Sequence, residues 1–486
     1  MGLSRRAAIT TGGTLLFGAA IYPTSVVANE DESGIDWRSF GGDDGNTGYN
    51  SSARVPKENI SELWRFDEFP DFPSGPAVAD GMVYFGTFGG EVLGVEASSG
   101  QERWRTRLSE ELGDIPDDVP TPAVADGSVY LGSKSGQVFS LDTTTGKVDW
   151  KRNAGSEITT PVEVSDGRVY AVANGVTAMD AESGDEIWEF SEDYFFDSGL
   201  AVVDGTVYVG STGGTMYALN SDDGSVVWKS DVGDEVRAPP AVADGTVYIG
   251  TDAGDLFALD TADGSPRWTT NLDQELYTSP AVSEELVFAG GETGSGFYAI
   301  DRSSGSVEWE AKISEKRNNV RASPAVADGV VFITDGDLRA IDIESGEDIW
   351  RYPRGDFISS PPAVVDGAVL VGNWDASMYA ISNEQLKERI TELQPPSSED
   401  SSSSPSEDTS SSTSGDTSSS SSSSETERSS ESSEPSTSAT EEPVQRGFLS
   451  NGNDEQFGML SDPFLLTVGG FALSVIGVLH SMIGGK

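Results

Sequence analysis

Residues 240–268 read PAVADGTVYIGTDAGDLFALDTADGSPRW, and this stretch decides the fold because residues 76–382 contain further copies of it. PAVAD and TVYIG are short apolar segments joined by Asp-Gly, a pair typical of the two-residue type I′ turn in β-hairpins. DLFALD predicts a third strand, TADG a turn, and SPRWTT a fourth strand. One copy therefore predicts four strands and leaves no room for a crossover helix.

Two landmarks identify the copies along the chain. The first is an Asp-Gly pair between apolar residues, which occurs seven times, with Glu284-Glu285 at the corresponding place of an eighth, degenerate copy. The second is a Trp four residues after a Gly, found at Trp104, Trp150, Trp188, Trp228, Trp268, Trp309 and Trp350. A period of about 40 residues is typical of propellers and solenoids. Four strands in each copy favour a β-propeller.

The number of landmarks predicts how the ring closes. Eight hairpin units are followed by only seven Trp residues, and Trp64 lies 40 residues before Trp104 with no hairpin in front of it. We therefore predict an all-β, eight-bladed β-propeller of four-stranded blades over residues 61–382, with the N-terminal strand around Trp64 closing the last blade. We expect all eight Trp rings to fill the gaps between blades, where each buries about 150–250 Å².

The repeat resembles a known family. SLDTTTGKVDW (140–150) and FALDTADGSPRW (257–268) are similar to the repeat of the pyrroloquinoline-quinone (PQQ) propeller proteins, and the resemblance covers about residues 35–382. One group in this family consists of PQQ- and calcium-dependent alcohol dehydrogenases. A second group consists of smaller, cofactor-free scaffold proteins that resemble the outer-membrane assembly factor BamB.

The resemblance implies specific residues for the enzyme group. Its members place a pair of adjacent cysteines against the cofactor, and they hold calcium with Glu, Asn and Asp residues on long insertions. This chain has no Cys and lacks those insertions. We therefore predict no catalytic, cofactor-binding or metal-binding residues. A PQQ-dependent oxidoreductase, or a cofactor-binding relic of one with PQQ and calcium, is the alternative.

Composition restricts the partners further. The chain has 81 acidic and 30 basic residues, an imbalance that would repel the phosphates of nucleic acids. Such acidity, with only nine Lys among the basic residues, suits a halophilic protein that stays soluble at high salt. The only His is His480, within the mostly apolar run at residues 463–483, which leaves the propeller without His-dependent metal sites or triads.

The N-terminal residues predict export. Ser4-Arg5-Arg6 is a twin-arginine pattern, followed by a modest apolar run and a small-residue cleavage site that ends at Ala28. We expect residues 1–28 to form the export signal and residues 29–60 to pack as a coil on the propeller.

The C-terminal residues predict a tether. Residues 383–396 read as a short helix, and residues 397–442 are rich in Ser, Thr and Glu, which predicts a disordered stalk. After a spacer at 443–462, residues 463–483 are mostly apolar and long enough for one transmembrane helix. We expect the propeller to lie outside the cell, anchored to the membrane by this helix. A sorting signal that is removed after export is the alternative for the C-terminal segment.

The predicted binding face is formed by the connectors from each outer strand to the next inner strand, which all open around one mouth of the ring. Two of them, at 107–121 and 311–322, are enlarged. The candidate partner-binding residues are Arg237, Tyr277, Lys312, Lys316, Arg317 and Arg321. A positive patch there would favour an anionic ligand or an acidic partner segment. The alternative is that these cations only neutralise nearby carboxylates.

Another connector contains Tyr194–Phe196, which reads either as an exposed apolar anchor or as the beginning of an inner strand. Together these features favour a non-catalytic binding or scaffold propeller with a monomeric head and a protein partner. A surface adhesin for glycans is a further alternative.

Overall fold

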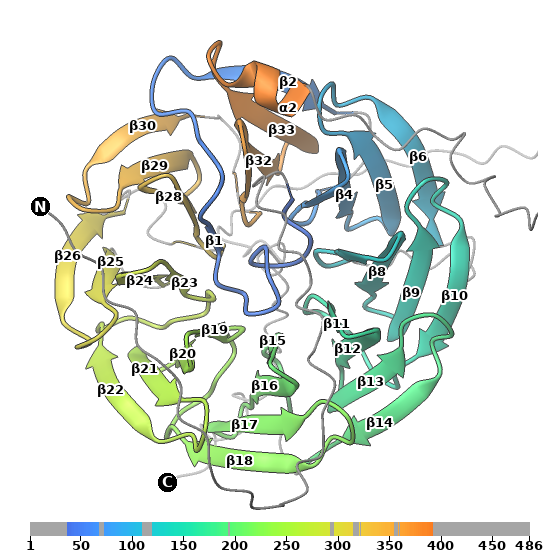
Figure 1. Ribbon diagram of the computed structural model, residues 1–486, viewed down its shortest axis with the longest axis vertical. Coiled ribbons are helices and arrows are strands. Elements are labelled where there is room, and N and C mark those ends of the chain that lie inside the picture. Colours follow the sequence, from blue (N-terminus) through green and yellow to red (C-terminus); the bar gives the residue numbers. More distant parts are fainter. Residues whose placement is uncertain are drawn as a thin grey trace, which may run out of the picture. The chain divides into compact units, whose positions relative to one another are not determined.

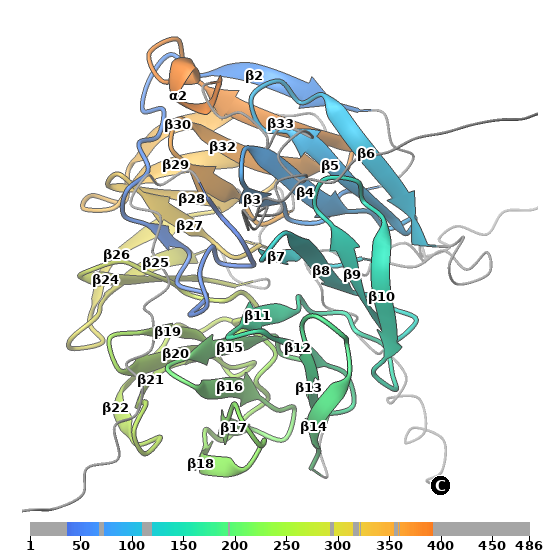
Figure 2. The ribbon, with the colours of Figure 1, turned by 45° about the vertical axis from the view of Figure 1, so that its right-hand side comes forward.

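The computed structural model describes residues 36–67, 72–108, 119–192, 195–291, 296–313, 320, 322–353, 358 and 360–391. Within these ranges the chain forms eight four-stranded antiparallel blades arranged in a ring, as Figures 1 and 2 show. The predicted eight-bladed propeller is therefore confirmed.

Each blade runs from an inner strand near the ring centre to an outer strand at the rim. Blades 1 to 4 comprise β3 (Ala77–Ala79), β4 (Met82–Gly86), β5 (Glu91–Glu96), β6 (Glu102–Arg107); β7 (Ala123–Ala125), β8 (Ser128–Gly132), β9 (Gln137–Asp142), β10 (Val148–Asn153); β11 (Glu163–Ser165), β12 (Arg168–Val172), β13 (Val176–Asp180), β14 (Glu186–Phe190); and β15 (Leu200–Val203), β16 (Thr206–Gly210), β17 (Thr215–Asn220), β18 (Val226–Asp231). Blades 5 to 8 comprise β19 (Ala241–Ala243), β20 (Thr246–Gly250), β21 (Asp255–Asp260), β22 (Pro266–Asn271); β23 (Ala281–Val282), β24 (Leu286–Gly290), β25 (Gly296–Asp301), β26 (Val307–Lys312); β27 (Ala325–Ala327), β28 (Val330–Thr334), β29 (Leu338–Asp342), β30 (Asp348–Tyr352); and β31 (Ala363–Val365), β32 (Ala368–Asn373), β33 (Ser377–Ser382), β2 (Ser61–Phe66).

Blade 8 is built from both ends of the propeller. β2 pairs antiparallel with β33, with Trp64 opposite Ala380, so the N-terminal strand supplies the outer strand of the last blade. This is the closure that the position of Trp64 predicts. Without β2, the edge of β33 would be unpaired and open to aggregation.

The Asp-Gly turns follow the prediction in six blades and depart from it in one. In six pairs both residues have positive φ, as a type I′ turn requires, at Asp80, Asp126, Asp166, Asp204, Asp244 and Asp328 with the glycines after them. In Asp366-Gly367 only Gly367 does, at 102°. The Asp366 carboxylate instead accepts the backbone N–H of Arg54 at 2.9 Å and pairs with Arg389. The hairpin keeps its two-residue turn, with Val365 opposite Ala368, but these contacts accompany a conformation other than type I′.

The Trp residues fasten each blade to the next one. Every repeat indole donates its Nε1–H to a backbone carbonyl across the blade junction at 2.7–2.9 Å. In seven junctions the ring also lies on a glycine of the next blade, so close that a Cβ there would come within 2.3–2.7 Å of the indole. The Gly-to-Trp spacing seen in the sequence therefore serves two different junctions: the Gly receives one Trp, and the following Trp reaches the next blade.

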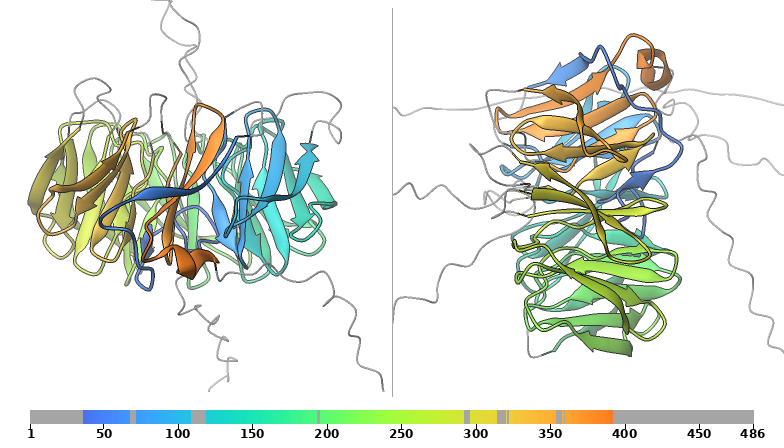
Figure 3. Two further views of the ribbon diagram at one scale, coloured as in Figure 1. Left: turned by 90° about the horizontal axis from the view of Figure 1, so that it is seen from above. Right: turned by 90° about the vertical axis from the view of Figure 1, so that its left-hand side faces the viewer.

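Residues 37–50, which we call the central segment, contact the inner strand of every blade. Their carbonyls accept the N–H of one Val in each of β3, β7, β15, β19, β23 and β27, at 2.6–2.9 Å. In the other two blades, Asp44 accepts from the Ser165 hydroxyl and Asn50 donates to the Val364 carbonyl. β1 (Tyr49–Asn50) pairs with β27 in parallel. Figure 1 shows the segment in dark blue across the centre of the ring, and Figure 3 shows it against one side.

One buried carboxylate faces this segment. Glu163 is 3% exposed and lies opposite Tyr170, at a position where the corresponding residue of every other inner strand is apolar. Burial raises the pKa of Glu163 well above its usual range, the charge of Asp44 adds to this, and the Ser39 hydroxyl opposes it. Burial also raises the pKa of Asp43 to about 6, against hydrogen bonds from Thr47. The contact between blade 3 and the central segment is thus sensitive to protonation.

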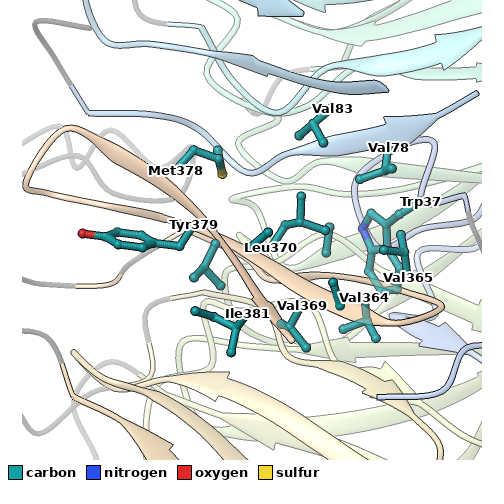
Figure 4. Close-up of a cluster of buried hydrophobic side chains, with 14 of the residues drawn as sticks. Trp37, Val78, Val83, Val364, Val365, Val369, Leu370, Met378, Tyr379 and Ile381 are labelled. Atoms are coloured by element: carbon teal, nitrogen blue, oxygen red, sulfur yellow. The ribbon is translucent and has the colours of Figure 1, made fainter. Parts of the chain in front are cut away.

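The largest buried cluster joins the closing blade to its neighbours. Trp37 of the central segment packs with β-branched residues of β31 and β32 and with Val78 of β3, as Figure 4 shows. Apolar burial of this kind is the main favourable term in folding. The N-terminal residues therefore belong to the core of the ring.

The chain continues beyond blade 8 into helix α2 (Lys387–Thr391), whose Ile390 is buried. No helix in the described part of the chain is long and apolar enough to cross a membrane. The predicted export signal, stalk and membrane helix lie outside the described residues.

Candidate partner-binding face

Two of the candidate residues stand where the connectors enter inner strands. Arg237 precedes β19 and Tyr277 precedes β23. The apolar residue just before each of them, Val236 or Leu276, is fully buried, and its N–H donates to a loop carbonyl of the preceding blade at 3.1–3.2 Å. These anchors fix the backbone, so Arg237 and Tyr277 have defined positions on what we call the connector face.

Arg237 is held by two carboxylates. Its guanidinium pairs with Glu235 and, through Nε, with Asp252 Oδ2 at 3.0 Å. The Asp252 backbone N–H also donates to the Glu235 carbonyl at 3.0 Å, which joins the connector to the loop after β20. Burial raises the pKa of Asp252 to about 7; Arg237 lowers it, and neighbouring carboxylates raise it. Oδ1 of Asp252 is buried without a hydrogen-bond partner.

Tyr277 extends the same cluster into blade 6. Its hydroxyl donates to Glu275 Oε2 at 3.1 Å. Burial raises the pKa of this phenol, and the charges of Asp252 and Glu275 raise it further. On the other side, burial also raises the pKa of Asp197, which lies within electrostatic range of Arg237. The structure therefore places Arg237 and Tyr277 within electrostatic range of each other.

The surroundings of Arg237 differ from the predicted positive patch. One guanidinium lies among the carboxylates of Asp197, Asp234, Glu235, Asp252 and Glu275. The acidic members could not be assigned from sequence because they come from different blades and stand out in no way from the other carboxylates. Lys312 ends the outer strand β26 and is exposed. Lys316, Arg317 and Arg321 lie outside the described residues, so the positive patch around them stays a prediction.

Among the described residues of this face, Phe195 is the largest exposed apolar side chain. It is 68% exposed, yet its carbonyl accepts from both the N–H and the hydroxyl of Thr212, at 3.0 and 3.1 Å. The next residue, Phe196, is buried against Phe190 and Tyr217. The inner strand β15 begins only at Leu200, so the interpretation as a strand start is wrong for Phe195 and Phe196, and Tyr194 lies outside the described residues. Fixed backbone with an exposed ring matches the other interpretation, an apolar anchor.

The described residues also bear on cofactor chemistry. They contain no group of three or more His, Cys, Asp or Glu side chains arranged to hold a metal ion. The chain has no cysteine at all. The connector face presents the exposed ring of Phe195, the ion pairs of Arg237 and several carboxylates.

The repeats, the ring and this face define a propeller of the PQQ-repeat class. The chain belongs to the family described as outer membrane protein assembly factor BamB, whose model matches residues 55–120, 116–195, 173–323 and 236–418. The resemblance predicted from the repeat is thereby confirmed. No curated protein matches the chain.

Solved structures share the fold at low identity. BamB from Moraxella catarrhalis is 18% identical with a TM-score of 0.57, over 66% of this chain and 99% of that one. Quinohemoprotein alcohol dehydrogenase from Comamonas testosteroni is 16% identical with a TM-score of 0.59, over 72% and 80%. A europium-containing methanol dehydrogenase is 14% identical with a TM-score of 0.58, over 72% and 98%. The same fold thus serves a protein of the assembly-factor family and two dehydrogenases.

Proposed function

We propose that this chain is a non-catalytic scaffold propeller, exported and anchored in the membrane, that docks a protein partner on its connector face. Membership of the BamB family supports a scaffold role. The twin-arginine pattern and the apolar residues 463–483 support export and anchoring.

The observation on which the docking proposal rests is the exposed Phe195. An aromatic ring on fixed backbone loses little conformational entropy when a partner covers it, and such rings are common energetic anchors of protein interfaces. Asp197 follows two residues later and is electrostatically coupled to Arg237. An apolar centre with a polar and charged rim is typical of protein–protein interfaces.

Cross-linking on intact cells tests this role. A photo-reactive amino acid at position 195 is compared with the same amino acid at Val227, which is 54% exposed on the outer strand β18. We expect one discrete cross-linked protein from position 195 and none from position 227, and we expect Phe195→Ala to reduce its co-purification. The same adducts from both positions, or none from position 195, would contradict docking at this face.

The second candidate is a PQQ-linked oxidoreductase, favoured by the dehydrogenases among the structural neighbours. The side chains present do not fit that group, because the chain has no cysteine pair and the described residues offer no metal-binding cluster. We assign no reaction step through the cofactor.

A further inference from the structure

The outer rim of blades 1 to 3 has two adjoining open depressions, of about 380 and 560 Å³. The first lies between β6 and the turn before β10, and the second lies between β10 and the turn after β13; Val148 lines both. Figure 1 shows β6 and β10 at the outer edge of the ring. We call these two depressions together the rim groove.

The rim groove is lined mainly by basic residues in a very acidic chain. Its charged lining residues are Arg105, Arg107, Lys147, Lys151 and Arg152 against Asp149 and Glu182. In the whole chain, acidic residues outnumber basic ones 81 to 30. Among the lining residues, basic side chains thus outnumber acidic ones five to two, and Glu91, Glu102 and Asp185 pair with three of these basic groups.

The repeat shows that the fold does not require these basic residues. The residue after the blade Trp is basic in five blades, at Arg65, Arg105, Lys151, Lys229 and Arg351, but it is Glu189 in blade 3, Thr269 in blade 5 and Glu310 in blade 6. All of these blades form the same outer strand and the same Trp contact. The Trp contact therefore does not depend on a basic residue at this position.

A buried carboxylate positions two of the guanidinium groups. Glu91 is 5% exposed, and it accepts from Arg105 Nη1 at 3.0 Å and from Arg107 Nε at 2.8 Å. Glu102 holds Arg105 from the other side at 2.7 Å. The Arg107 side chain remains 58% exposed. Because a guanidinium has five N–H donors in a fixed fork, a pair oriented from beneath can still meet an oxyanion from solvent.

The second depression is organised in a similar way. Arg152 Nη2 donates to the Ser183 carbonyl at 2.9 Å and pairs with Asp185 at 3.2 Å, while its side chain stays 44% exposed. Lys147, at the junction of the two depressions, is exposed. The basic groups thus follow one another along the rim of blades 1 and 2.

We propose that the rim groove binds an extended sugar chain bearing carboxylate or sulfate groups. The arginine forks suit these oxyanions, and the lining adds hydroxyls such as Thr106 and Thr145. A protein partner would need an apolar anchor, and the apolar side chains of the lining are Val148, which is partly buried, and Trp150, which is buried. A nucleic acid would place closely spaced phosphates over the acidic surface beyond the groove. This site is separate from the connector face and does not depend on the function proposed there.

Fluorescent oligosaccharides test the proposal on the full chain in detergent, across a series of KCl concentrations. Oligogalacturonate tests carboxylates, sulfated dextran tests sulfates, and neutral dextran and single-stranded DNA are controls. Arg107→Gln, Lys147→Gln and Arg152→Gln are combined in one variant. The matched control combines Lys134→Gln, Lys229→Gln and Arg267→Gln, which remove the same charge elsewhere on the propeller. Arg105 stays unchanged so that Glu91 keeps a partner.

We expect at least one charged oligosaccharide to bind, with an affinity about tenfold lower in the groove variant and changed less than about twofold in the control. Preference for one of the two probes identifies the anionic group. An equal loss in both variants, no binding of either probe, or equally tight binding of DNA would overturn the proposal. If the groove variant melts earlier than the wild type, Lys147→Gln alone decides the question, because Lys147 is exposed.

Discussion

Trp350 Nε1 donates a hydrogen bond of 2.7 Å to the carbonyl of Pro56, a residue 294 positions away in the chain. At the other seven junctions, the acceptor is the residue directly after the third strand of the next blade, as Ala97 is for Trp64. In blade 8 that position is Asn383, and the chain does not turn there into a fourth strand. Pro56, just before β2, supplies the carbonyl instead. The closing junction thus repeats the hydrogen bond of the ordinary one, with residues from both ends of the propeller, but not its contact between the indole and a glycine.

The first prediction concerns this junction. Trp350→Ala should lower the free energy of unfolding by about 3–5 kcal/mol, because a large ring leaves the blade interface. Trp350→Phe should cost less, since it keeps an aromatic ring but loses the hydrogen bond, worth about 1 kcal/mol. Guanidinium denaturation measures both. Trp228→Phe, at an ordinary junction, should lower the free energy of unfolding by the same amount as Trp350→Phe. If Trp350→Phe alone has no effect, the hydrogen bond at the closing junction is not equivalent to the others.

The second prediction separates backbone strain from packing at two glycines. Gly127 and Gly264 have φ values of 79° and 72°, but a Cβ on Gly127 meets nothing within 4 Å, whereas one on Gly264 would lie 2.6 Å from Trp228. Gly127→Ala should therefore cost only the left-handed conformation, about 1–2 kcal/mol. Gly264→Ala should cost about 1–3 kcal/mol more, because the indole must move. Equal melting temperatures for the two variants would show that the close packing of Trp228 on Gly264 does not matter for stability.

The repeat allowed the fold to be predicted in detail, down to the closing strand. Trp64 was the decisive signal, because it keeps the period without a hairpin of its own. The partners of the indoles could not be predicted, since each acceptor is a backbone carbonyl, which has no sequence signature. The central segment was expected only as a coil. Its residues follow no period, although their carbonyls meet one Val in each of six blades.

The candidate site was only partly accessible to sequence reasoning. The shared place of Arg237 and Tyr277 follows from the repeat, since equivalent positions of neighbouring blades face the same mouth. The carboxylates around them could not be inferred from the repeat, because Asp252 comes from a loop inside blade 5 and is close to Arg237 only in the folded structure. The rim groove was missed for a different reason. Its basic residues lie beside the blade Trp residues, and the sequence pattern of these strands was interpreted only through the packing of the Trp.

The third prediction concerns the oxidoreductase alternative. Purified chain titrated with PQQ and calcium should show no saturable change in Trp fluorescence or quinone absorbance, because neither a cysteine pair nor a cluster of metal ligands is available among the described residues. The circular dichroism of the same sample must show a folded β-protein. One-to-one saturation at micromolar PQQ would revive the enzyme and justify a screen of alcohols and sugars.

The last prediction concerns pH and the contact between blade 3 and the central segment. Asp43 has a pKa raised by burial from 3.8 to about 6, and the pKa of Glu163 is raised well above 4.5. The folded state therefore binds more protons than the unfolded state in this range. The stabilisation is fully present below the unfolded pKa values and is lost as the pH rises through the folded ones. The free energy of unfolding should accordingly fall as the pH rises from about 4.

Glu163→Gln removes one of these groups while keeping a side chain of similar size that can meet the Ser39 hydroxyl. The variant should gain stability relative to the wild type as the pH rises, and its unfolding free energy should depend less on pH. Chemical denaturation of both proteins at a series of pH values measures this. Glu189→Gln is the matched control, because Glu189 is exposed on β14 and its substitution also removes one negative charge. If both variants flatten the pH profile to the same degree, the effect reflects the overall acidity of the chain, and the buried Glu163 is not the cause.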